Sequence, residues 1–512
     1  MEKDRSSLMY GTLLLTGTGI AGQVLGFLYR IALSRMIGAE VMGLYQLIMP
    51  VYSVLLSLTA VGLTVAVSTL ASRFGALGQR QAMERTLRLC VGVFLVLITA
   101  LGCGVTALYD PISVYLLGDA RTQLGLLLLP ACVLLTGVEN LHKHLFYGMG
   151  NVRPPALVEL TEQFIRAGAV LGLLALFLPQ NAERTVGLIV AGMILCEVFS
   201  AVSLIVLYQR FRRRDTRPPG APEPRLGRKI AAIALPIGAT SLLGNLMNSA
   251  NSVLIPARLV AAGTEVSQAM SSFGVVCGMT LPMLTLPTAF LGAMGLLLVP
   301  KLAESTALGR KREVHRRIDR AMLATSVVIL PCMALTVVVG PTFGRALFHE
   351  AAVGDYMLPL AVGVVFSCYH GILGGALNGV GRQGAAARNS LISGAVQLAF
   401  TAALTGIPGV GLWGFVIGFI VSDLLAVLLN GASLVRATGL PLRLYAWVTA
   451  PGLASILMGL CVNLLFRELL RRGLEALPAA LACVVFGGVL YLSALAAQGV
   501  DLRELFRVRK KL

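Results

Sequence analysis

Long apolar segments follow one another along almost the whole chain, and each is long enough to cross a lipid bilayer as an α-helix. About 20 apolar residues are needed to span the hydrocarbon core. Gly, Pro and short charged clusters bound the segments, which lack the alternation that is typical of outer-membrane strands. The sequence therefore predicts an all-α integral membrane protein with about fourteen transmembrane helices. We place them at about 9–30, 43–69, 89–109, 122–142, 155–178, 186–208, 230–257, 271–300, 321–341, 356–378, 389–407, 411–435, 445–466 and 477–498.

The charged residues support this interpretation by their scarcity and by their placement. Only 13% of the 512 residues are charged, against about 25% in a soluble protein. Most of the 42 Lys and Arg residues fall on one face of the predicted map, which also receives both termini, the run 210–229 and the run 301–320. Cytoplasmic loops are the basic ones in membrane proteins. We therefore expect a membrane protein with an uncleaved first helix and both termini in the cytoplasm, and no nucleic-acid partner despite the net charge of +18.

Short sequence matches at one constant separation indicate that the membrane unit is duplicated. Residues 76–80 (ALGQR) recur as 307–311 (ALGRK), and Gly148-Met149-Gly150 recurs as Gly379-Val380-Gly381, each 231 positions later. This interval contains six predicted helices, and an even number gives both copies the same orientation, as in parallel transporter repeats. The predicted organisation is a six-helix lobe at 1–210, a basic Pro-rich linker at 211–228, a six-helix lobe at 229–440, and two further helices with a basic tail at 441–512.

Two arginines lie at the outer end of the first predicted helix, on the side that otherwise carries few basic residues. Inserting a charge into a membrane costs about 2.5–3.5 kcal/mol on insertion scales, so each such residue requires a compensating interaction or a functional role. Arg30 and Arg35 either reach the outer lipid headgroups or line a cationic cavity. Five positions correspond to about 500° on a helix, so the two side chains do not share one face. Both explanations stay open for Arg30, and contact with headgroups is favoured for Arg35.

The fifth predicted helix carries a possible ion pair deep within it. Glu162 and Arg166 are four residues apart with the acid first, which is the favourable order on a helix. The pair either holds the helix bundle together or contributes to a substrate or ion site. Two further acids within helices, Glu197 and Asp423, are candidates for coupling to H⁺ or Na⁺.

Three amides form a polar stripe on the seventh predicted helix. Asn245, Asn248 and Asn251 are spaced by three and are followed by Arg258. They either make hydrogen bonds between helices or form a wall that faces the substrate or an ion. The nine cysteines are scattered singly without metal-ligand spacing, so we interpret them as packing residues and expect neither a metal nor a cofactor.

Several short motifs resemble the stage V sporulation protein B family, in the polysaccharide-exporter branch of the MOP flippase superfamily. This superfamily also holds the MurJ lipid II flippases and the multidrug MATE transporters. The resemblance extends over essentially the whole chain. Its residues are Val24–Phe27 with Tyr29 and Arg30, Leu33–Glu40, Gly43–Gln46, Pro50–Tyr52, Glu162 and Gln163 with Arg166, and Leu254–Pro256 with Arg258 and Leu259.

The resemblance implies two lobes in a V around a cavity that exports an undecaprenyl-pyrophosphate-linked saccharide, with Arg30 as a headgroup contact. The cavity arginines that MurJ-type flippases carry on helices two and eight have no counterpart at Val54–Leu58 or Val275–Met279. The resemblance therefore supports membership of the polysaccharide-exporter branch, but it does not support lipid II as the particular cargo.

We expect a transporter that works by alternating access on a lipid-linked saccharide, with membrane lipids as neighbours and an ion or the membrane potential as the driving force. The alternative is a MATE-like, cation-coupled multidrug antiporter, whose site would need acids and aromatic residues. No nucleophile elbow, Walker loop or GxGxxG motif is present, and the predicted outer loops are short. The chain is therefore not predicted to be an enzyme.

Overall fold

The computed structural model describes residues 2–177, 181–214, 223 and 225–499, and no strand occurs among them. The predicted all-α class is confirmed. Most of the predicted linker (residues 215–222 and 224) and the basic tail from residue 500 lie outside the described residues. The chain forms two compact units, Met1–Gly274 and Val275–Leu512.

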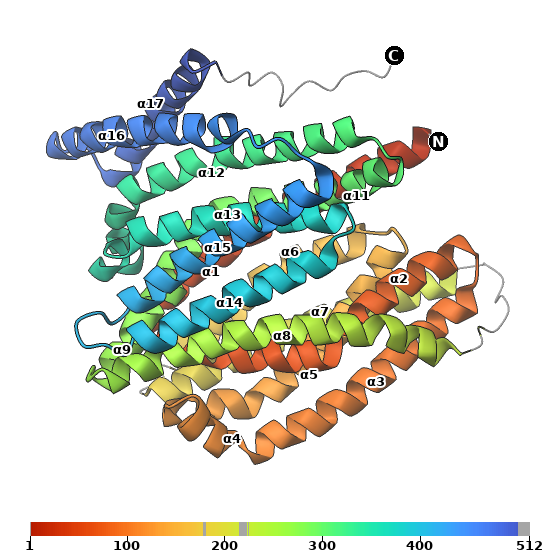
Figure 1. Cartoon of the computed structure of the whole chain (residues 1–512). Coiled ribbons are helices and arrows are strands. Elements are labelled where there is room, and N and C mark those ends of the chain that lie inside the picture. The colour runs from red at the N-terminus through yellow and green to blue at the C-terminus, as the bar shows by residue number, and fades with distance from the viewer. Residues whose placement is uncertain (1, 178–180, 215–222, 224, 500–512) are drawn as a thin grey trace. The chain divides into compact units, whose positions relative to one another are not determined.

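The first unit consists of long helices with short π and 3₁₀ segments between some of them (Figure 1). In it, α5 packs against α7, α3 and α2, while α1 packs against α6, α8 and α9. Its elements are α1 (Glu2–Leu56), η1 (Ser57–Val61), α2 (Gly62–Ala76), α3 (Arg80–Ala107), α4 (Tyr109–Pro111), η2 (Ile112–Leu116), η3 (Ala120–Thr122), α5 (Gln123–Gly148), α6 (Arg153–Phe177), α7 (Ala182–Arg214), α8 (Leu226–Ala261) and α9 (Val266–Phe273).

The second unit is built in the same way, with α13 and α14 packed on α15, and α12 packed on α16. The described elements from the end of α9 onward are η4 (Gly274–Thr280), α10 (Leu281–Thr285), η5 (Leu286–Thr288), α11 (Ala289–Ala307), α12 (Lys311–Phe348), η6 (Ala351–Gly354), α13 (Met357–Gly379), α14 (Gln383–Leu404), α15 (Trp413–Thr438), η7 (Tyr445–Thr449), α16 (Ala450–Arg471) and α17 (Ala476–Ala497).

Twelve segments within the described residues are long and apolar enough to cross a membrane. The first two predicted helices fall in a single segment, Gly17–Ala76, but Gly38 interrupts α1 with a left-handed backbone (φ 73°) between them. The helix predicted at 389–407 corresponds to α14, which is not among the twelve. The count of fourteen transmembrane helices therefore stays a prediction.

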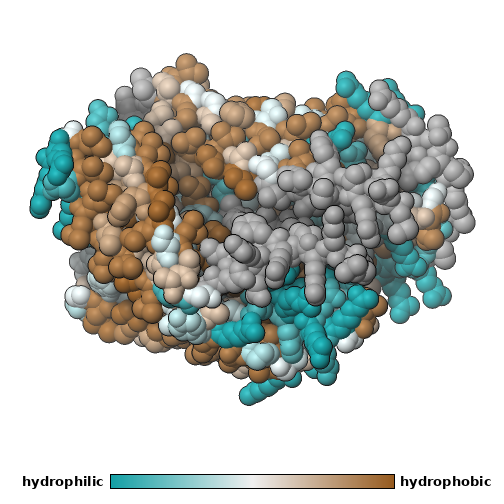
Figure 2. Space-filling view, turned by 90° about the horizontal axis from the view of Figure 1, so that it is seen from above, coloured by the Kyte–Doolittle hydropathy of each residue, from teal (hydrophilic) through white to brown (hydrophobic). Residues whose placement is uncertain are grey.

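Exposed apolar side chains cover the last two helices, which lie beside α12 (Figure 1). Leu453, Ile456 and Leu460 of α16 and Leu481 and Val485 of α17 are all more than half exposed. Figure 2 shows a broad apolar surface on this side of the molecule, with hydrophilic side chains gathered at its edges. Such a surface is stable against lipid tails and unstable against water.

The matched sequence motifs adopt the same turn in both units. Gly78 (φ 66°) and Gly309 (φ 65°) follow α2 and α11, and Gly150 (φ 73°) and Gly381 (φ 79°) follow α5 and α13. At each position a left-handed residue ends the helix and allows backbone N–H groups to cap its last carbonyl oxygens, a role for which glycine is preferred. Two helix ends in each unit therefore share this geometry, and the duplication itself stays a prediction. The extent of each repeat along the chain stays a prediction.

The packing places α8 and α9 with the first unit, although the predicted second lobe begins at residue 229. Two glycines allow α1 and α9 to meet backbone to backbone. A Cβ atom at Gly43 would lie 2.1 Å from the Met270 carbonyl oxygen, and one at Gly274 would lie 2.0 Å from the Ala39 carbonyl oxygen. No larger residue fits this crossing without a shift of the backbone.

Candidate functional site

An arginine in the middle of α6 is neutralised by carboxylates of two helices. Arg166 donates hydrogen bonds to Glu162 of the same helix and, at 3.4 Å, to Glu197 of α7. Glu162 and Glu197 are only 5% and 2% exposed. The predicted ion pair between Glu162 and Arg166 is present, and Glu197, which the sequence analysis treated as a lone acid, is the second partner. Arg166 thus joins α6 to α7 through charge.

A second ion cluster joins α5 to α6, and the sequence analysis did not identify it. Lys143 Nζ lies 3.6 Å from Glu139 and 3.5 Å from Glu159. Glu139 is 3% exposed, so its charge also needs a partner within the protein. The spacing of four between Glu139 and Lys143 is the one signal in the sequence that points to this cluster.

Arg30 of α1 belongs to the same neighbourhood as Arg166. Helices α1 and α6 pack together, and a Cβ atom at Gly26 would lie 3.8 Å from Oε1 of Gln163. The structure therefore brings together two arginines that are 136 positions apart in the sequence (30 and 166).

Four buried donor groups of the first unit have no hydrogen-bond partner in the part of the chain that the structure describes. They are the Tyr29 hydroxyl, Nε of Arg166, Nε of Arg258 and the Ser200 hydroxyl. Buried polar atoms are nearly always paired with protein or water, so each such atom requires an explanation. All four groups can donate a hydrogen bond, and the two guanidinium groups are also positively charged. An anion would satisfy these donors, although Oε2 of Glu197 is a buried acceptor that also lacks a hydrogen-bond partner among the described residues.

The predicted polar stripe on α8 separates into three different environments. Asn245 Nδ2 donates to Ser57 Oγ at 2.5 Å, which ties α8 to the π-helical segment η1. Asn251 is buried, whereas Asn248 is exposed. Of the two explanations for these amides, hydrogen bonding between helices is observed for Asn245.

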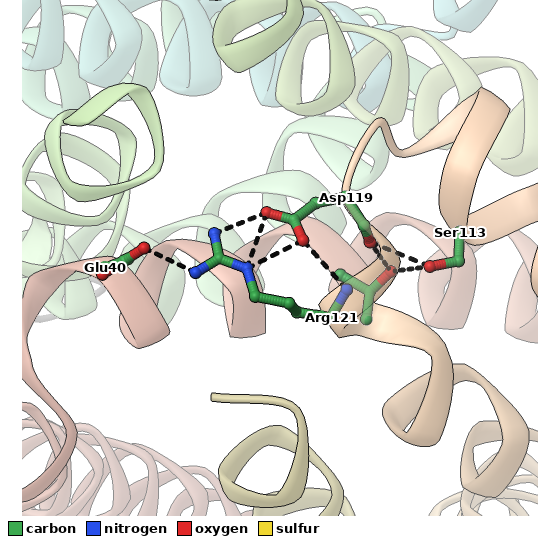
Figure 3. A network of polar contacts seen from close by, with 5 residues as sticks. Glu40, Ser113, Asp119 and Arg121 are labelled. Carbon is green, nitrogen blue, oxygen red and sulfur yellow. Dashed lines mark hydrogen bonds and ion pairs between the residues drawn. The ribbon is translucent and has the colours of Figure 1, made fainter. Parts of the chain in front are cut away.

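A polar network ties the kinked region of α1 to the segment before α5 (Figure 3). Arg121 donates to Glu40 at 2.6 Å and to Asp119 at 2.7 Å. The hydroxyl of Ser113 in turn donates to the Asp119 carbonyl oxygen at 2.9 Å. Arg35, five residues before Glu40, is exposed, as expected for an arginine that reaches lipid headgroups.

In the second unit, Asp423 has a partner that the sequence analysis missed. Its Oδ1 atom lies 2.9 Å from Nδ1 of His370, whose Nε2 atom lies 3.1 Å from Oγ of Ser390. The three residues come from α15, α13 and α14. Because His370 and Asp423 are separated by 53 positions, no spacing rule relates them.

The second unit also contains a cavity of about 580 Å³ beside this group. Its lining residues are apolar or small, with a few hydroxyl groups, and none of them is charged. Examples are Leu291, Gly295, Val364, Gly371 and Phe419. The charged candidate residues of the first unit therefore have no counterpart in the lining of this cavity.

Comparison with models of protein families shows the family to which the chain belongs. The model of the family described as polysaccharide biosynthesis protein matches residues 8–291, more than half of the chain. The chain belongs to this family. As a member of the polysaccharide biosynthesis protein family it is a multi-pass membrane protein, and the resemblance drawn from its motifs is confirmed.

Two curated relatives from Bacillus subtilis (strain 168) match most of this family member. Stage V sporulation protein B is 24% identical over 86% of both chains. Lipid II flippase MurJ is 23% identical and covers 77% of this chain and 76% of its own length.

Solved structures of the superfamily share the fold. An inward closed structure of lipid II flippase MurJ has a TM-score of 0.67 at 12% identity, over 97% of this chain and all of that one. An inward-facing multidrug resistance MATE family transporter of the MOP superfamily also has a TM-score of 0.67, at 15% identity, over 81% of this chain and 96% of that one. The fold is therefore that of the MOP superfamily.

Proposed function

We propose that this protein is a flippase that moves an undecaprenyl-pyrophosphate-linked saccharide from the inner to the outer leaflet of the bacterial cytoplasmic membrane. The name of one relative, lipid II flippase MurJ, supports this class of substrate. Alternating access of the bundle is the mechanism, and both termini face the cytoplasm, in keeping with the basic residues on that side.

The observation that carries the proposal is the set of buried donors that have no acceptor among the described residues. Tyr29 and Arg258 each hold an unpaired donor atom in the first unit, and Arg166 holds a third. Pyrophosphate is an anion with several acceptor oxygens, and arginine binds it through charge-assisted hydrogen bonds. Arg30, one residue after Tyr29 on α1, supplies a further positive charge.

In this proposal some of the residues bind the substrate, and others balance charge or couple transport to an ion. Arg30 and Arg258 bind the pyrophosphate, with Arg35 at the outer end of the path and the amides of Asn245, Asn248 and Asn251 along α8. Arg166 is paired with acids through Nη2, which positions α6, and its Nε atom contributes to the donor set. Glu162, Glu197 and Asp423 are the candidates for coupling to H⁺ or Na⁺, and the membrane potential is the alternative driving force.

A MATE-like antiporter that exchanges organic cations is the second candidate, and the buried acids favour it. Glu139, Glu162 and Glu197 are all 5% exposed or less, and they lie on three neighbouring helices. Two basic residues already contact this group, Lys143 and Arg166. The remaining negative charge would suit a cationic substrate. Energised efflux of a cationic dye that depends on Glu162 would support this function.

The proposal is tested by lipid II exposure at the outer leaflet of cells that are depleted of their own flippase and express this chain. The wild-type chain should restore exposure. Arg30→Ala should reduce exposure at least tenfold at equal membrane expression, because a hydrogen bond to a charged group contributes about 1.5–3 kcal/mol.

Arg85→Ala is the matched control, since Arg85 is an exposed arginine of α3 outside the candidate site. This variant should retain full exposure. Exposure that is unchanged by Arg30→Ala would remove Arg30 from the site. Absence of rescue by a well-expressed wild-type chain would reject lipid II as the cargo and direct the assay to other lipid-linked glycans or to cationic dyes.

A further inference from the structure

A small pocket with several basic side chains lies at one end of the helices of the second unit, away from the Asp423 group. It has a volume of about 300 Å³. The first turns of α12 and the connection between α15 and η7 form it. Its lining residues are His315, Arg316, Asp319, Arg320, Leu440, Pro441 and Arg443.

The only carboxylate in this lining is held by two donors of the same unit. Asp319 accepts a hydrogen bond from Trp447 Nε1 at 2.5 Å and another from Arg443 Nη1 at 3.2 Å. His315 Nε2 lies 2.8 Å from the Thr438 carbonyl oxygen. Asp319 and His315 thus fix the shape of the pocket, and the described lining holds one carboxylate and three arginines.

Two of the arginines, Arg316 and Arg443, leave donor capacity for an anion. Arg316 makes no ion pair with any of the described residues, and its side chain is exposed. The side chain of Arg443 is 61% exposed and uses one N–H group on Asp319, although a guanidinium group has five. The pocket therefore carries excess positive charge at a point that an anionic group can reach.

Apolar side chains lie directly beside these charges. Leu442, Leu444 and Tyr445 are 57–58% exposed on the connection that lines the pocket. At this end α12 begins, α15 ends and α16 begins, so it corresponds to the boundary between the bilayer core and the headgroups. The excess positive charge suits the phosphate of a phospholipid headgroup, and the exposed apolar side chains suit its acyl chains.

We propose that this pocket binds an anionic phospholipid, with the phosphate between Arg316, Arg320 and Arg443 and the acyl chains against Leu442 and Leu444. The lipid would tie the start of α12 to the connection before α16. The site is separate from the proposed saccharide path, and its occupancy does not depend on which substrate is transported.

The test counts phospholipids bound to the purified full chain by native mass spectrometry, with dioleoyl phosphatidylglycerol as the probe. Dioleoyl phosphatidylcholine and inorganic phosphate serve as competitors. Each basic residue near a lipid surface contributes about 1 kcal/mol. We therefore expect Arg316→Gln with Arg320→Gln to weaken phosphatidylglycerol binding about 25-fold, and Arg316→Gln alone to weaken it about fivefold, at about 1.4 kcal/mol per factor of ten.

The matched control is Lys311→Gln with Arg312→Gln, which removes the same charge from exposed residues at the start of α12 that do not line the pocket. This variant should bind phosphatidylglycerol as the wild type does. Equal losses in both double variants would show general surface attraction and overturn the site. Equal binding of phosphatidylcholine, or full displacement by millimolar phosphate, would also overturn the assignment to an anionic phospholipid.

Discussion

Replacing Arg166 with methionine should be one of the most destabilising single changes in the first unit. The substitution removes the cation that contacts Glu162 and Glu197, whose side chains are 6% and 3% exposed. Removal of one partner from a buried ion pair costs about 3–5 kcal/mol, because the remaining charge stays buried without compensation. Arg166 is itself only 26% exposed, so solvent screens the interaction little. We therefore expect the free energy of unfolding to fall by about 3–5 kcal/mol.

Neutralising the two acids as well should restore most of this loss. Arg166→Met combined with Glu162→Gln and Glu197→Gln leaves no buried charge in this group, and such replacements are often neutral or stabilising. The assay is equilibrium unfolding of the purified variants in mixed micelles with increasing SDS, followed by circular dichroism. Arg85→Met, at an exposed position, should change the free energy by no more than about 0.5 kcal/mol.

Two results would refute this reasoning. A loss below about 1 kcal/mol for Arg166→Met would mean that water already reaches both carboxylates. A triple variant as unstable as the single variant would mean that Arg166 acts through the packing of its side chain, and not through its charge.

Three smaller predictions use the same unfolding assay. Gly43→Ala should lower the free energy of unfolding by about 1–3 kcal/mol, because its Cβ atom would lie 2.1 Å from the Met270 carbonyl oxygen. An unchanged free energy of unfolding would show that α1 and α9 can move apart at this crossing without cost. Arg121→Gln should cost about 1–3 kcal/mol, because it leaves a buried carboxylate with one backbone donor, and Arg121→Lys should recover part of the loss. His370→Ala should lower the free energy of unfolding by about 1–3 kcal/mol, because it leaves Asp423 without this partner. A second substitution, Asp423→Asn, should then lower it little further. Fully additive losses would contradict the pairing of His370 with Asp423.

The helices and the turns between them were predictable because their causes are local. A segment in lipid must satisfy its backbone hydrogen bonds internally, so the apolar length alone predicts a helix. The equivalent turns at Gly78 and Gly309 likewise depend only on residues within one helical turn. The ion pair of Glu162 with Arg166 was predictable for the same reason, since both residues lie on one helix.

The partners on other helices were not predictable from this single sequence. Glu197 contacts Arg166 across 31 positions, and His370 contacts Asp423 across 53. The helix faces that meet depend on rotation about each axis, and nearly every face of these helices is apolar. Hydrophobic periodicity therefore gives little guidance within a membrane, where lipid and protein are equally apolar.

The sequence by itself determined the class of the protein, its multi-pass character, the recurring glycine motifs and the residues whose charge within the membrane requires a partner or a function. Only the tertiary structure decided what those charges do. Acids of α6 and α7 neutralise Arg166, Tyr29 and Arg258 keep buried donors without a partner among the described residues, and α8 packs with the first unit. The physical reason is the range of the forces involved. Backbone hydrogen bonds of a helix are made within four residues, whereas a buried charge takes its partner from whichever helix the packing brings beside it.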